Sequence, residues 1–581
     1  MIDKTSASFM QSLCCGEVRE DIVFPYPKIK QCEKDILSFM FESFDSFLKT
    51  HEKDFIEWDK AGEMPESFIE ELKQFGMFGI IVPEKFDGIG LGSASYSRAI
   101  QEVAKYDGSV AVTIGAHSSI GMRGLLMFGT ESQKKKYLPR LATGELIAAF
   151  CLTESCAGSD AAALKTRAVR SGNHWVLNGE KLWITNGGFA NFFTVLAKTQ
   201  GDDGKDHVTA FIVTRDMGGV TSGPHENKMG ICASSTTTVN FDNVHVPEEN
   251  VMGEVGQGFK VAMKILNGGR TGLSGGAVGS MKKLIKLIVL QAKERKQFGK
   301  PIASFGLIKQ KISDMVVRCY VSESVVNMLA GLIDQGYQDY AIEAAISKVL
   351  SSEALWDSSD DALQIAGGNG YMKEFPYERI MRDSRINRIF EGTNDILRLM
   401  IALTGMKSAG DSLKEVPKAL RGILTNPAKN FGVLSKFAIK QVSLHVPVRL
   451  SSNSFEKISP EIRGQAEVFE DCARRFEMAS ASVLRKYGKH VVDKQQVVQR
   501  LADIMVDLYA LVCTLSRVDA RIKAVGFNKS KQEANILKIF AGQMKNRVEN
   551  NCRSINSNSD YVEESLSDYV CDAECYEWDN I

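Results

Sequence analysis

The sequence predicts a multidomain α+β protein in which a helical region, a β region and two further helical regions follow one another. Its 581 residues suit about three or four domains, because one hydrophobic core rarely grows beyond about 250–300 residues. Apolar residues recur at helical spacing before residue 149 and after residue 256, whereas short β-rich runs fill the stretch between. The predicted segments are an N-terminal extension (1–30), a helical domain (31–149), a β domain (150–255), a helical domain (256–408), a loop with an amphipathic segment (409–460), an extra helical domain (461–553) and an acidic tail (554–581).

The first helical region shows its periodicity in Ile36, Phe39, Met40 and Phe44, which recur at the spacing of one helix face. The second shows it in an apolar surface made by Leu284, Ile285, Leu287, Ile288 and Leu290. Helical patterning continues from 461 to 548. From Ser554 onward the chain is acidic and has no lysine or arginine, which predicts a disordered tail.

The β region consists of short runs of β-branched and aromatic residues. Asn178 with Gly179, and Asn186 with the two glycines after it, provide turn residues between neighbouring runs. This spacing predicts a compact antiparallel sandwich or barrel. The clearest runs are His174–Leu177, Leu182–Thr185, Phe192–Leu196, Val208–Val213 and Thr236–Phe241.

The composition is that of a soluble globular protein, with 44% hydrophobic and 24% charged residues. Lysine plus arginine and aspartate plus glutamate number 71 each, and this balance disfavours a general nucleic-acid binder. No uninterrupted apolar run approaches the roughly 18 to 20 residues that cross a bilayer, so no membrane span is expected. The 12 cysteines lack metal-site spacing, so we predict reduced cysteines and no metal site.

Several catalytic motifs are absent or unsupported. The sequence has no phosphate-loop motif G-x-x-x-x-G-K-[ST] and no zinc-protease motif H-E-x-x-H. One G-x-S-x-G occurs over Gly272–Gly276, but no strand leads into it, as a nucleophile elbow requires. We interpret that match as chance.

Two clusters with possible chemistry lie in the β region. The stretch from Phe150 to Asp160 leaves an apolar strand and enters a loop of small hydroxyl residues, where Thr153 and Ser159 could donate hydrogen bonds to ring heteroatoms or phosphate. By itself this stretch would be read as a strand end with a turn. In the second cluster, Trp183 and Thr185 lie on one side of a period-2 strand, which suits a flat heteroaromatic cofactor, although a buried core tryptophan is the ordinary explanation.

Two more clusters lie in the following helical region. Arg295 and Phe298 close an amphipathic helix and could meet a pyrophosphate and an adenine, or could simply form a solvated helix end. Beyond Gln364, paired glycines permit close approach of the backbone to a bulky ligand. Glu391 precedes a helix that Thr393 or Asn394 would cap, where an acid often only complements the helix dipole.

Taken together, the four clusters resemble the acyl-CoA dehydrogenase family. The matching motifs are T-E-x-x-x-G-S-D from Thr153, W-I-T-N-G-G from Trp183, E-R-x-x-F-G from Glu294 and E-G-T-N from Glu391. The resemblance extends from about Val23 to about Gly405, and the segment 23–27 together with the extra helical domain is similar to the very-long-chain branch. Ser155 stands where the family usually has proline, a change that loosens the loop but removes no ligand group.

The resemblance implies a helical N-terminal domain, a β-barrel or sandwich middle domain and a four-helix bundle, with FAD between the last two. Arg295 and Phe298 would reach the FAD of a neighbouring subunit, which implies a homodimer. The implied substrate contacts are Ser159, Asn267, Arg270 and Gly392. The implied cofactor positions are Phe150, Leu152, Thr153, Ser159, Trp183, Thr185, Arg295, Phe298, Gln364, Gly368, Thr393 and Asp395.

The family places its catalytic base at one of two positions. One is the E-G-T glutamate, here Glu391, and the other is the residue before a helix arginine, here Gly269 before Arg270. Because glycine cannot act as a base, Glu391 is predicted to remove the α-proton and Arg270 to be its electrostatic partner. Exclusion of water would raise the basicity of the carboxylate, while hydrogen bonds to the thioester carbonyl would stabilise the enolate.

The implied function is FAD-dependent α,β-dehydrogenation of long- or very-long-chain acyl-CoA to trans-2-enoyl-CoA in fatty acid β-oxidation, with electrons passed to electron-transfer flavoprotein. An acyl-CoA oxidase would share the architecture but deliver its electrons to oxygen. A third possibility is a respiratory complex I assembly factor, because the ninth family member resembles this chain and has that second role. An intact Glu391 favours catalysis but does not exclude assembly work.

The resemblance also implies the matrix side of the inner mitochondrial membrane, although Asp3 and the lack of arginine before Arg19 make a poor mitochondrial leader. The stretch from Lys414 to Leu450 has seven basic residues and Glu415 as its only acid. Its apolar residues can share one helix face, which predicts peripheral contact with a membrane surface. The alternative, a helix that packs on the bundle with its lysines in solvent, is about as well supported by the residues alone.

Overall fold

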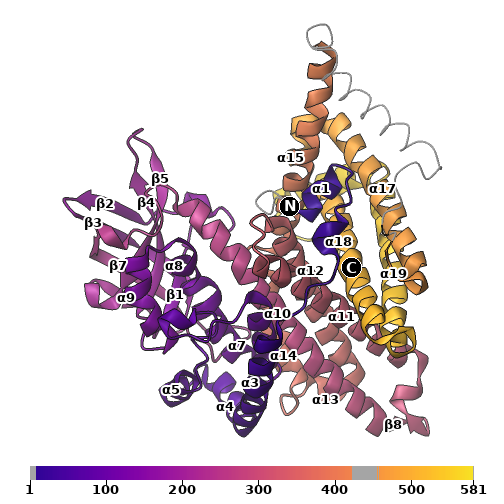
Figure 1. Cartoon of the computed structure of the whole chain (residues 1–581), viewed down its shortest axis with the longest axis horizontal. Coiled ribbons are helices and arrows are strands. Elements are labelled where there is room, and N and C mark those ends of the chain that lie inside the picture. The colour runs from indigo at the N-terminus through magenta and orange to yellow at the C-terminus, as the bar shows by residue number, and fades with distance from the viewer. Residues whose placement is uncertain (1–7, 422–454, 456, 580–581) are drawn as a thin grey trace. The chain divides into compact units, whose positions relative to one another are not determined.

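The computed structural model describes residues 8–421, 455 and 457–579 and divides into two compact units. The first unit contains Pro25–Leu397, and the second joins Ser8–Phe24 to the chain from Arg398 onward. Within the first unit, the strands gather in one region and the long helices α10 (Gly258–Glu294), α11 (Gly306–Asp334) and α12 (Ala341–Ala366) form another (Figure 1). The predicted order of helical, β and helical regions is therefore confirmed.

The N-terminal region of the first unit is helical, as predicted, but its buried stripe differs from the expected one. In α3 the buried side chains are Leu37, Met40, Phe44 and Leu48, whereas Phe39 is 74% exposed. The sequence allowed either stripe, and packing on the neighbouring helices selects the one that excludes Phe39. The helices are α3 (Gln31–Thr50), α4 (Asp54–Ala61), α5 (Glu66–Gln74), α6 (Ser93–Ala104), α7 (Gly108–Gly115), the π-helical η2 (Ala116–Gly121), α8 (Arg123–Phe128) and α9 (Glu131–Ala142).

The β region is one seven-stranded sheet in the order β1-β4-β2-β3-β7-β6, with β5 also paired to β4. All seven strands contribute buried residues to one core, which the sheet therefore surrounds as in a barrel or sandwich. The sheet is mixed, however, and not purely antiparallel as predicted, because β1 and β2 both pair with β4 in parallel. The strands are β1 (Ala148–Cys151), β2 (Arg167–Ser171), β3 (His174–Thr185), β4 (Phe192–Gln200), β5 (Asp206–Thr214), β6 (Val220–Ser222) and β7 (Thr236–Pro247).

The predicted turn at Asn178 and Gly179 is wrong, because both residues lie inside β3. The register between β3 and β7 shifts between Leu177 and Gly179, which marks a bulge or irregularity in the pairing. A Cβ added at Gly179 would lie 2.4 Å from the Thr166 hydroxyl and 2.8 Å from its Cα. The glycine therefore permits close approach of a neighbouring backbone within the sheet.

The helical bundle of the first unit is built from α10, α11, α12 and the shorter α14 (Tyr377–Arg385), with α13 (Gly368–Tyr371) between the last two. Helix α11 is long and apolar enough to cross a membrane by length and composition, with a mean hydropathy of 1.4 over its most apolar window. Because 72% of that window is buried inside the protein, packing in the bundle accounts for its composition.

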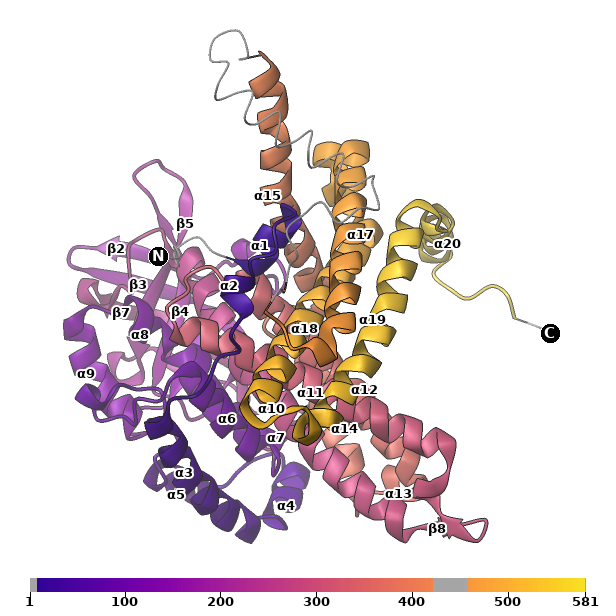
Figure 2. The ribbon, with the colours of Figure 1, turned by 45° about the vertical axis from the view of Figure 1, so that its right-hand side comes forward.

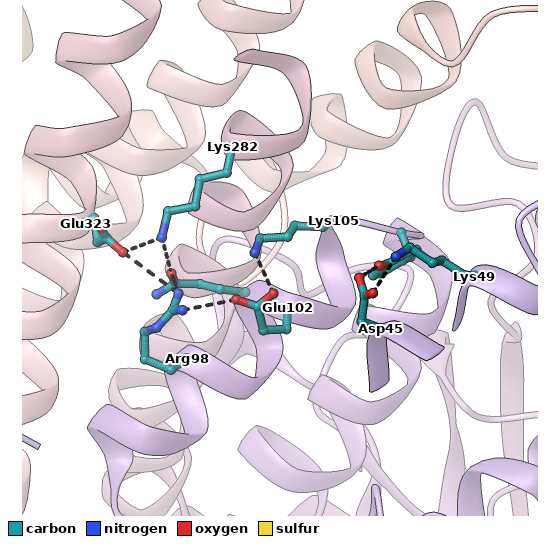
Figure 3. Close-up of polar contacts among 9 residues, drawn as sticks. Asp45, Lys49, Arg98, Glu102, Lys105, Lys282 and Glu323 are labelled. Carbon is teal, nitrogen blue, oxygen red and sulfur yellow. Dashed lines mark hydrogen bonds and ion pairs between the residues drawn. The ribbon is translucent and has the colours of Figure 1, made fainter. Parts of the chain in front are cut away.

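Charged side chains connect the bundle to the N-terminal helices (Figure 3). Lys282 of α10 forms an ion pair with Glu323 of α11 and donates a hydrogen bond to Gln101 of α6 at 3.0 Å. Arg98 of α6 forms an ion pair with Glu102 at 3.0 Å one turn further along the same helix. This network joins α6 to the bundle helices α10 and α11.

The second unit is helical and is formed by two segments of the chain that are far apart in the sequence. Its helices α17, α18 and α19 run side by side (Figure 2). The N-terminal segment packs into the same core, since Phe9 is fully buried with its ring centroid 6.1 Å from that of Tyr509, and the Ser516 hydroxyl donates to the Val23 carbonyl. The helices are α1 (Phe9–Cys14), α2 (Glu20–Val23), α15 (Asn394–Arg421, from Arg398 onward), α17 (Arg463–Tyr487), α18 (Gln495–Val525), α19 (Lys531–Asn556) and α20 (Asp560–Ala573).

Two sequence expectations for this part of the chain need correction. The predicted disordered tail contains α20, whose first turn carries Asp560 and Glu563, where acids complement the helix dipole. Arg500 pairs with Asp560 across two short contacts and anchors that helix to α18. Helix α15 continues to Arg421, although a loop was expected from residue 409. Most of the predicted membrane-contact segment lies outside the described residues.

Candidate active site

Glu391 lies in a tight turn between the short η7 (Ile386–Arg388) and α15. Its φ is +55° and that of Gly392 is +91°, so two successive residues have left-handed backbone angles. For a glutamate this conformation costs on the order of 1–3 kcal/mol and persists only when the surroundings hold it. Thr393 begins α15, because its hydroxyl accepts a hydrogen bond from the Ile396 amide at 3.3 Å, and the cap predicted at Thr393 or Asn394 is thereby assigned to Thr393.

The structure brings Arg270 and Asn267 of α10 to this turn. The guanidinium of Arg270 donates from Nε and Nη2 to the Glu391 carbonyl at 3.3 and 3.2 Å, and from Nη1 to Asn267 Oδ1 at 2.7 Å. Arg270 is 4% exposed, and burial lowers its pKa to about 10, which still leaves it a cation at neutral pH. Three residues predicted from separate parts of the sequence therefore form one cluster.

The Glu391 carboxylate has the environment of a strong base. Burial raises its pKa to about 7, although the cations of Arg270 and Lys348 act in the opposite direction. Its Oε2 is buried and has no hydrogen-bond partner among the described residues. A Cβ added at Gly269 would lie 3.1 and 3.2 Å from the two carboxylate oxygens. The Glu391 carboxylate therefore lies next to Gly269, the residue at the family's alternative base position.

Sequence reasoning missed Lys348 of α12, which contacts the same turn. Its side chain is fully buried, and Nζ donates to the Gly392 carbonyl and to Asn394 Oδ1, both at 2.8 Å. Burial lowers the pKa of Lys348 to about 7. A lysine among the apolar residues Ile346 and Val349 of one helix was the available indication, but helical periodicity alone does not say which lysines face inward.

A second cluster lies on strand β3 and on the loop that follows β1. Strand β3 holds the loop after β1, because the Leu182 amide donates to the Thr153 carbonyl at 2.9 Å. Lys181, which is fully buried, donates to the Leu152 carbonyl at 3.1 Å and to Glu154 at 2.7 Å. This buried ion pair fixes the loop that carries Thr153, a predicted cofactor position, next to Trp183.

Trp183 and Thr185 face away from the core, as the period-2 pattern predicts, since Ile184 between them is buried. The register of β3 shifts between Lys181 and Ile184, and Trp183 has a φ of +57°. Its indole is 62% exposed, which excludes the alternative of a core tryptophan. A flat aromatic face beside a hydroxyl is therefore present on the surface of this unit.

The π-helical η2 joins the two clusters. The Ala148 amide at the start of β1 donates to Nδ1 of the buried His117 at 2.9 Å, and His117 Nε2 donates to the Leu141 carbonyl at 3.1 Å. Burial lowers the His117 pKa to about 3, so the ring is neutral. A Cβ at Gly269 would lie 2.7 Å from the Ile120 side chain of the same segment. Strand β1 and Glu391 therefore flank η2.

Four further predicted cofactor residues, Arg295, Phe298, Gln364 and Gly368, lie at the far end of the bundle, whereas Asp395 lies in the first turn of α15. Arg295 and Phe298 follow α10 in a small hairpin of β8 (Lys296–Gln297) and β9 (Lys300–Pro301), and Gln291 donates to the Ala366 carbonyl at 3.2 Å, close to Gln364 and Gly368. Arg295 is 25 residues beyond Arg270, or about 37 Å along a helix. The structure thus does not bring this group to Glu391 within one chain.

Models of known protein families match most of the chain. Residues 39–145, 149–244 and 256–405 match the models of the acyl-CoA dehydrogenase N-terminal, middle and C-terminal domains. Residues 460–575 match the model "ACAD9/ACADV, C-terminal domain". The chain belongs to the acyl-CoA dehydrogenase family. As a member of that family it is a flavoprotein oxidoreductase, and its cofactor is FAD.

Relatives with this architecture come from animals and bacteria. The human very long-chain specific acyl-CoA dehydrogenase, mitochondrial, is 45% identical over 88% of this chain and 79% of its own length. A probable acyl-CoA dehydrogenase of Bacillus subtilis is 38% identical over 83% of this chain and 80% of its own. An acyl-CoA dehydrogenase from Bacillus anthracis, solved in complex with FAD, superimposes with a TM-score of 0.81 at 34% identity and covers 97% of this chain and 94% of that one.

Proposed function

We propose that this acyl-CoA dehydrogenase oxidises long- or very-long-chain acyl-CoA to trans-2-enoyl-CoA in fatty acid β-oxidation. The observation that carries the proposal is the Glu391 carboxylate, which is buried beside Gly269 with one oxygen free of hydrogen bonds within the described residues. The chain length of the substrate is supported by the very long-chain specific relatives at 41–45% identity.

Glu391 removes the α-proton of the thioester. A general base works best when its pKa lies near the working pH, and the raised pKa of about 7 meets that condition. Arg270 holds the Glu391 carbonyl and so orients the turn, and its positive charge favours the charge that develops as the proton leaves. Bound FAD supplies the acceptor for the hydride that leaves the β-carbon.

The residues present fit FAD. The exposed indole of Trp183 and the hydroxyl of Thr185 offer a stacking surface and a hydrogen-bonding group on the β region, where the other proposed positions are Phe150 of β1 and Leu152, Thr153 and Ser159 of the loop that follows it. A Cβ added at Gly367 or Gly368 would meet no atom within 4 Å, so the backbone at the far end of the bundle is open to a ligand. The remaining cofactor positions proposed there and at the start of α15 are Arg295, Phe298, Gln364, Thr393 and Asp395.

The substrate contacts proposed on this chain are Ser159, Asn267, Arg270 and Gly392. The predicted homodimer is supported by the distance of about 37 Å between Arg270 and Arg295 along one helix, since a neighbouring subunit can supply the second group where one chain does not. Electron-transfer flavoprotein is the proposed electron acceptor, and a solved chain titled as an electron transferring flavoprotein of Acidaminococcus fermentans is 36% identical over 65% of this chain, with a TM-score of 0.61.

A mitochondrial location is supported by the word "mitochondrial" in the names of the animal relatives, and the matrix side of the inner membrane remains a proposal. Peripheral membrane contact by residues 414–450 also remains a prediction. Co-sedimentation with cardiolipin-containing liposomes tests it, with Phe431→Asp/Phe437→Asp as the comparison. Equal binding by both proteins, or none by the wild type at low salt, would contradict it.

The enzymatic proposal is tested with Glu391→Gln and a series of acyl-CoAs of graded length. Glutamine keeps the shape of the side chain and removes the base, so FAD content is expected to stay normal while dye reduction falls on the order of 10²–10⁴-fold or more. Near-normal turnover would show that the base lies elsewhere. The alternative assembly role is tested by a native pull-down of complex I intermediates. The observation behind this alternative is the match of residues 460–575 to the ACAD9/ACADV domain model.

A further inference from the structure

Two consecutive carbonyls in the turn of the base each accept hydrogen bonds from a buried basic side chain, and the two side chains come from different helices. Arg270 of α10 donates to the Glu391 carbonyl, and Lys348 of α12 donates to the Gly392 carbonyl at 2.8 Å. Both side chains are buried, with exposed fractions of 4% and 0%. The left-handed turn that carries Glu391 is therefore hydrogen-bonded to two helices of the bundle, α10 and α12.

Lys348 also fixes the first residue of α15. Its Nζ donates to Asn394 Oδ1, and Asn394 Nδ2 in turn donates to Ser352 Oγ and to Glu353 Oε1, each at 3.0 Å. Asn394 is 3% exposed. The residues on both sides of Thr393 are thus tied to α12, and Lys348 is the side chain of that helix that bonds to both of them.

A buried ammonium group is costly, and an apolar residue of similar length would fill the same space without that cost. Packing alone therefore does not explain a lysine at this position. Local helix structure does not require a lysine here either, because the two acceptors of Lys348, Gly392 and Asn394, are 44 and 46 residues away in the sequence. What the ammonium group uniquely provides is a pair of charge-assisted hydrogen bonds to the turn, and a positive charge near the carboxylate.

We propose that Lys348 is a positioning residue for the catalytic base, which holds the Glu391–Gly392 turn so that the carboxylate lies beside Gly269. The proposal rests on the proposed role of Glu391. It predicts two effects of removing the ammonium group. The carboxylate loses its fixed position, which lowers kcat more than it changes KM, and it loses a nearby cation, which raises its pKa.

The change in the pKa of Glu391 also depends on the other charged groups near Lys348 and Glu391. Lys348 is near Glu391, Arg270 of α10, Glu353 of its own helix and Arg388 of η7. Among these, Arg270 remains beside Glu391 when Lys348 is replaced and continues to favour the ionised carboxylate. The acidic limb of the kcat/KM profile is therefore expected to move to higher pH without leaving the range near neutrality.

The test compares Lys348→Met, Lys348→Arg and the control Lys282→Met in the FAD-loaded enzyme. Lys282 is a partly buried lysine of the same bundle, 12 residues or about 18 Å along α10 from Arg270, and it pairs with Glu323 (Figure 3). Measurements are kcat and KM per bound FAD with palmitoyl-CoA, the pH profile, and the melting temperature. Lys348→Met is expected to lose 10- to 100-fold in kcat with less than a threefold change in KM, and its acidic limb to shift upward.

Lys348→Arg keeps a cation and is expected to recover part of kcat and the wild-type pH profile, while Lys282→Met should change the melting temperature only. If Lys348→Met does not fold, Asn394→Ala decides the matter, because it removes one acceptor and leaves the lysine; kcat per bound FAD should then fall severalfold. Wild-type kcat and pH profile in the folded variants would overturn the proposal. Activity of Glu391→Gln, by contrast, would overturn the assignment of the base, so the two failures are distinguishable.

Discussion

Gly269→Ala tests whether the space beside the base is required for catalysis. The added Cβ would lie 2.7 Å from Ile120 Cγ2 and 3.1 and 3.2 Å from the oxygens of Glu391, where ordinary contact begins at 3.4 Å. To restore that spacing, the Ile120 methyl group must withdraw by about 0.7 Å and the carboxylate by about 0.2–0.3 Å. Since a misplacement of about 1 Å can cost about 10²-fold in rate, we expect kcat to fall on the order of 10-fold.

The effect on stability is smaller, because two contributions oppose one another. Overfilling a packed site costs about 1–3 kcal/mol, whereas replacing glycine by alanine inside a helix stabilises by about 1 kcal/mol. The net expectation is a loss of about 0–2 kcal/mol in the free energy of unfolding. A 10-fold loss of kcat corresponds to about 1.4 kcal/mol in the activation free energy, so the catalytic effect is measurable even where the stability change is close to zero.

Gly276→Ala is the matched control in the same helix. Its added Cβ would meet Ile100 and Ala104 at 3.7 and 3.9 Å, which is ordinary contact, so this variant should keep kcat and gain up to about 1 kcal/mol of stability. The assay is steady-state dye reduction with palmitoyl-CoA on enzyme of known FAD content, together with thermal unfolding. Wild-type kcat and KM in Gly269→Ala would refute the placement of the carboxylate.

Three further outcomes follow from the structure. Because burial raises the pKa of Glu391 from 4.5 to about 7, stability associated with its protonated form is lost as pH rises through that interval; the melting temperature of Glu391→Gln should therefore gain on the wild type between pH 5 and pH 8, and a constant difference would contradict this. Lys181→Met leaves Glu154 buried without its cation and should cost about 3–5 kcal/mol and lower the FAD content, with partial recovery in Lys181→Met/Glu154→Leu, as measured by denaturant unfolding and the visible absorbance. Phe298→Asn relieves a φ of +50° at a residue that is 93% exposed, so the hairpin should be more stable by up to about 1 kcal/mol while FAD titration of the apoprotein shows weaker binding; unchanged affinity would remove Phe298 from the cofactor site.

The sequence predicted the parts of the site that stand in motifs. Glu391, Arg270 and Asn267 meet in the structure, and the position of Trp183 and Thr185 on one side of a strand is confirmed by the burial of Ile184 between them. The meeting of the first three residues was implied by the resemblance to the family, whereas the pattern of Trp183 and Thr185 is a local property of one strand. The succession of helical and β regions was visible for the same reason, since periodicity is a local property.

The errors at Gly179 and Phe39 and the omission of Lys348 all depend on contacts between distant residues. Gly179 looked like a turn residue because the close approach of Thr166 is invisible in the local pattern, and Phe39 looked like a core residue because two helix faces were similarly apolar. Lys348 was missed because its acceptors, Gly392 and Asn394, come from another part of the chain. A sequence pattern can say that a lysine is on a helix, but not what that helix packs against.

The discontinuity of the second unit has a consequence for synthesis of the protein. Its N-terminal segment ends at Phe24 and its remainder begins at Arg398, so the 373 residues of Pro25–Leu397 separate the two parts. At about 5–20 residues per second, a ribosome needs roughly 20–75 s to make that stretch. Throughout this time Phe9, Met10 and Leu13, which are at most 2% exposed in the finished structure, have no partner core to enter. The nascent chain therefore presents an apolar helix to chaperones while the first unit is still being made, and completion of the second unit is the step that withdraws it.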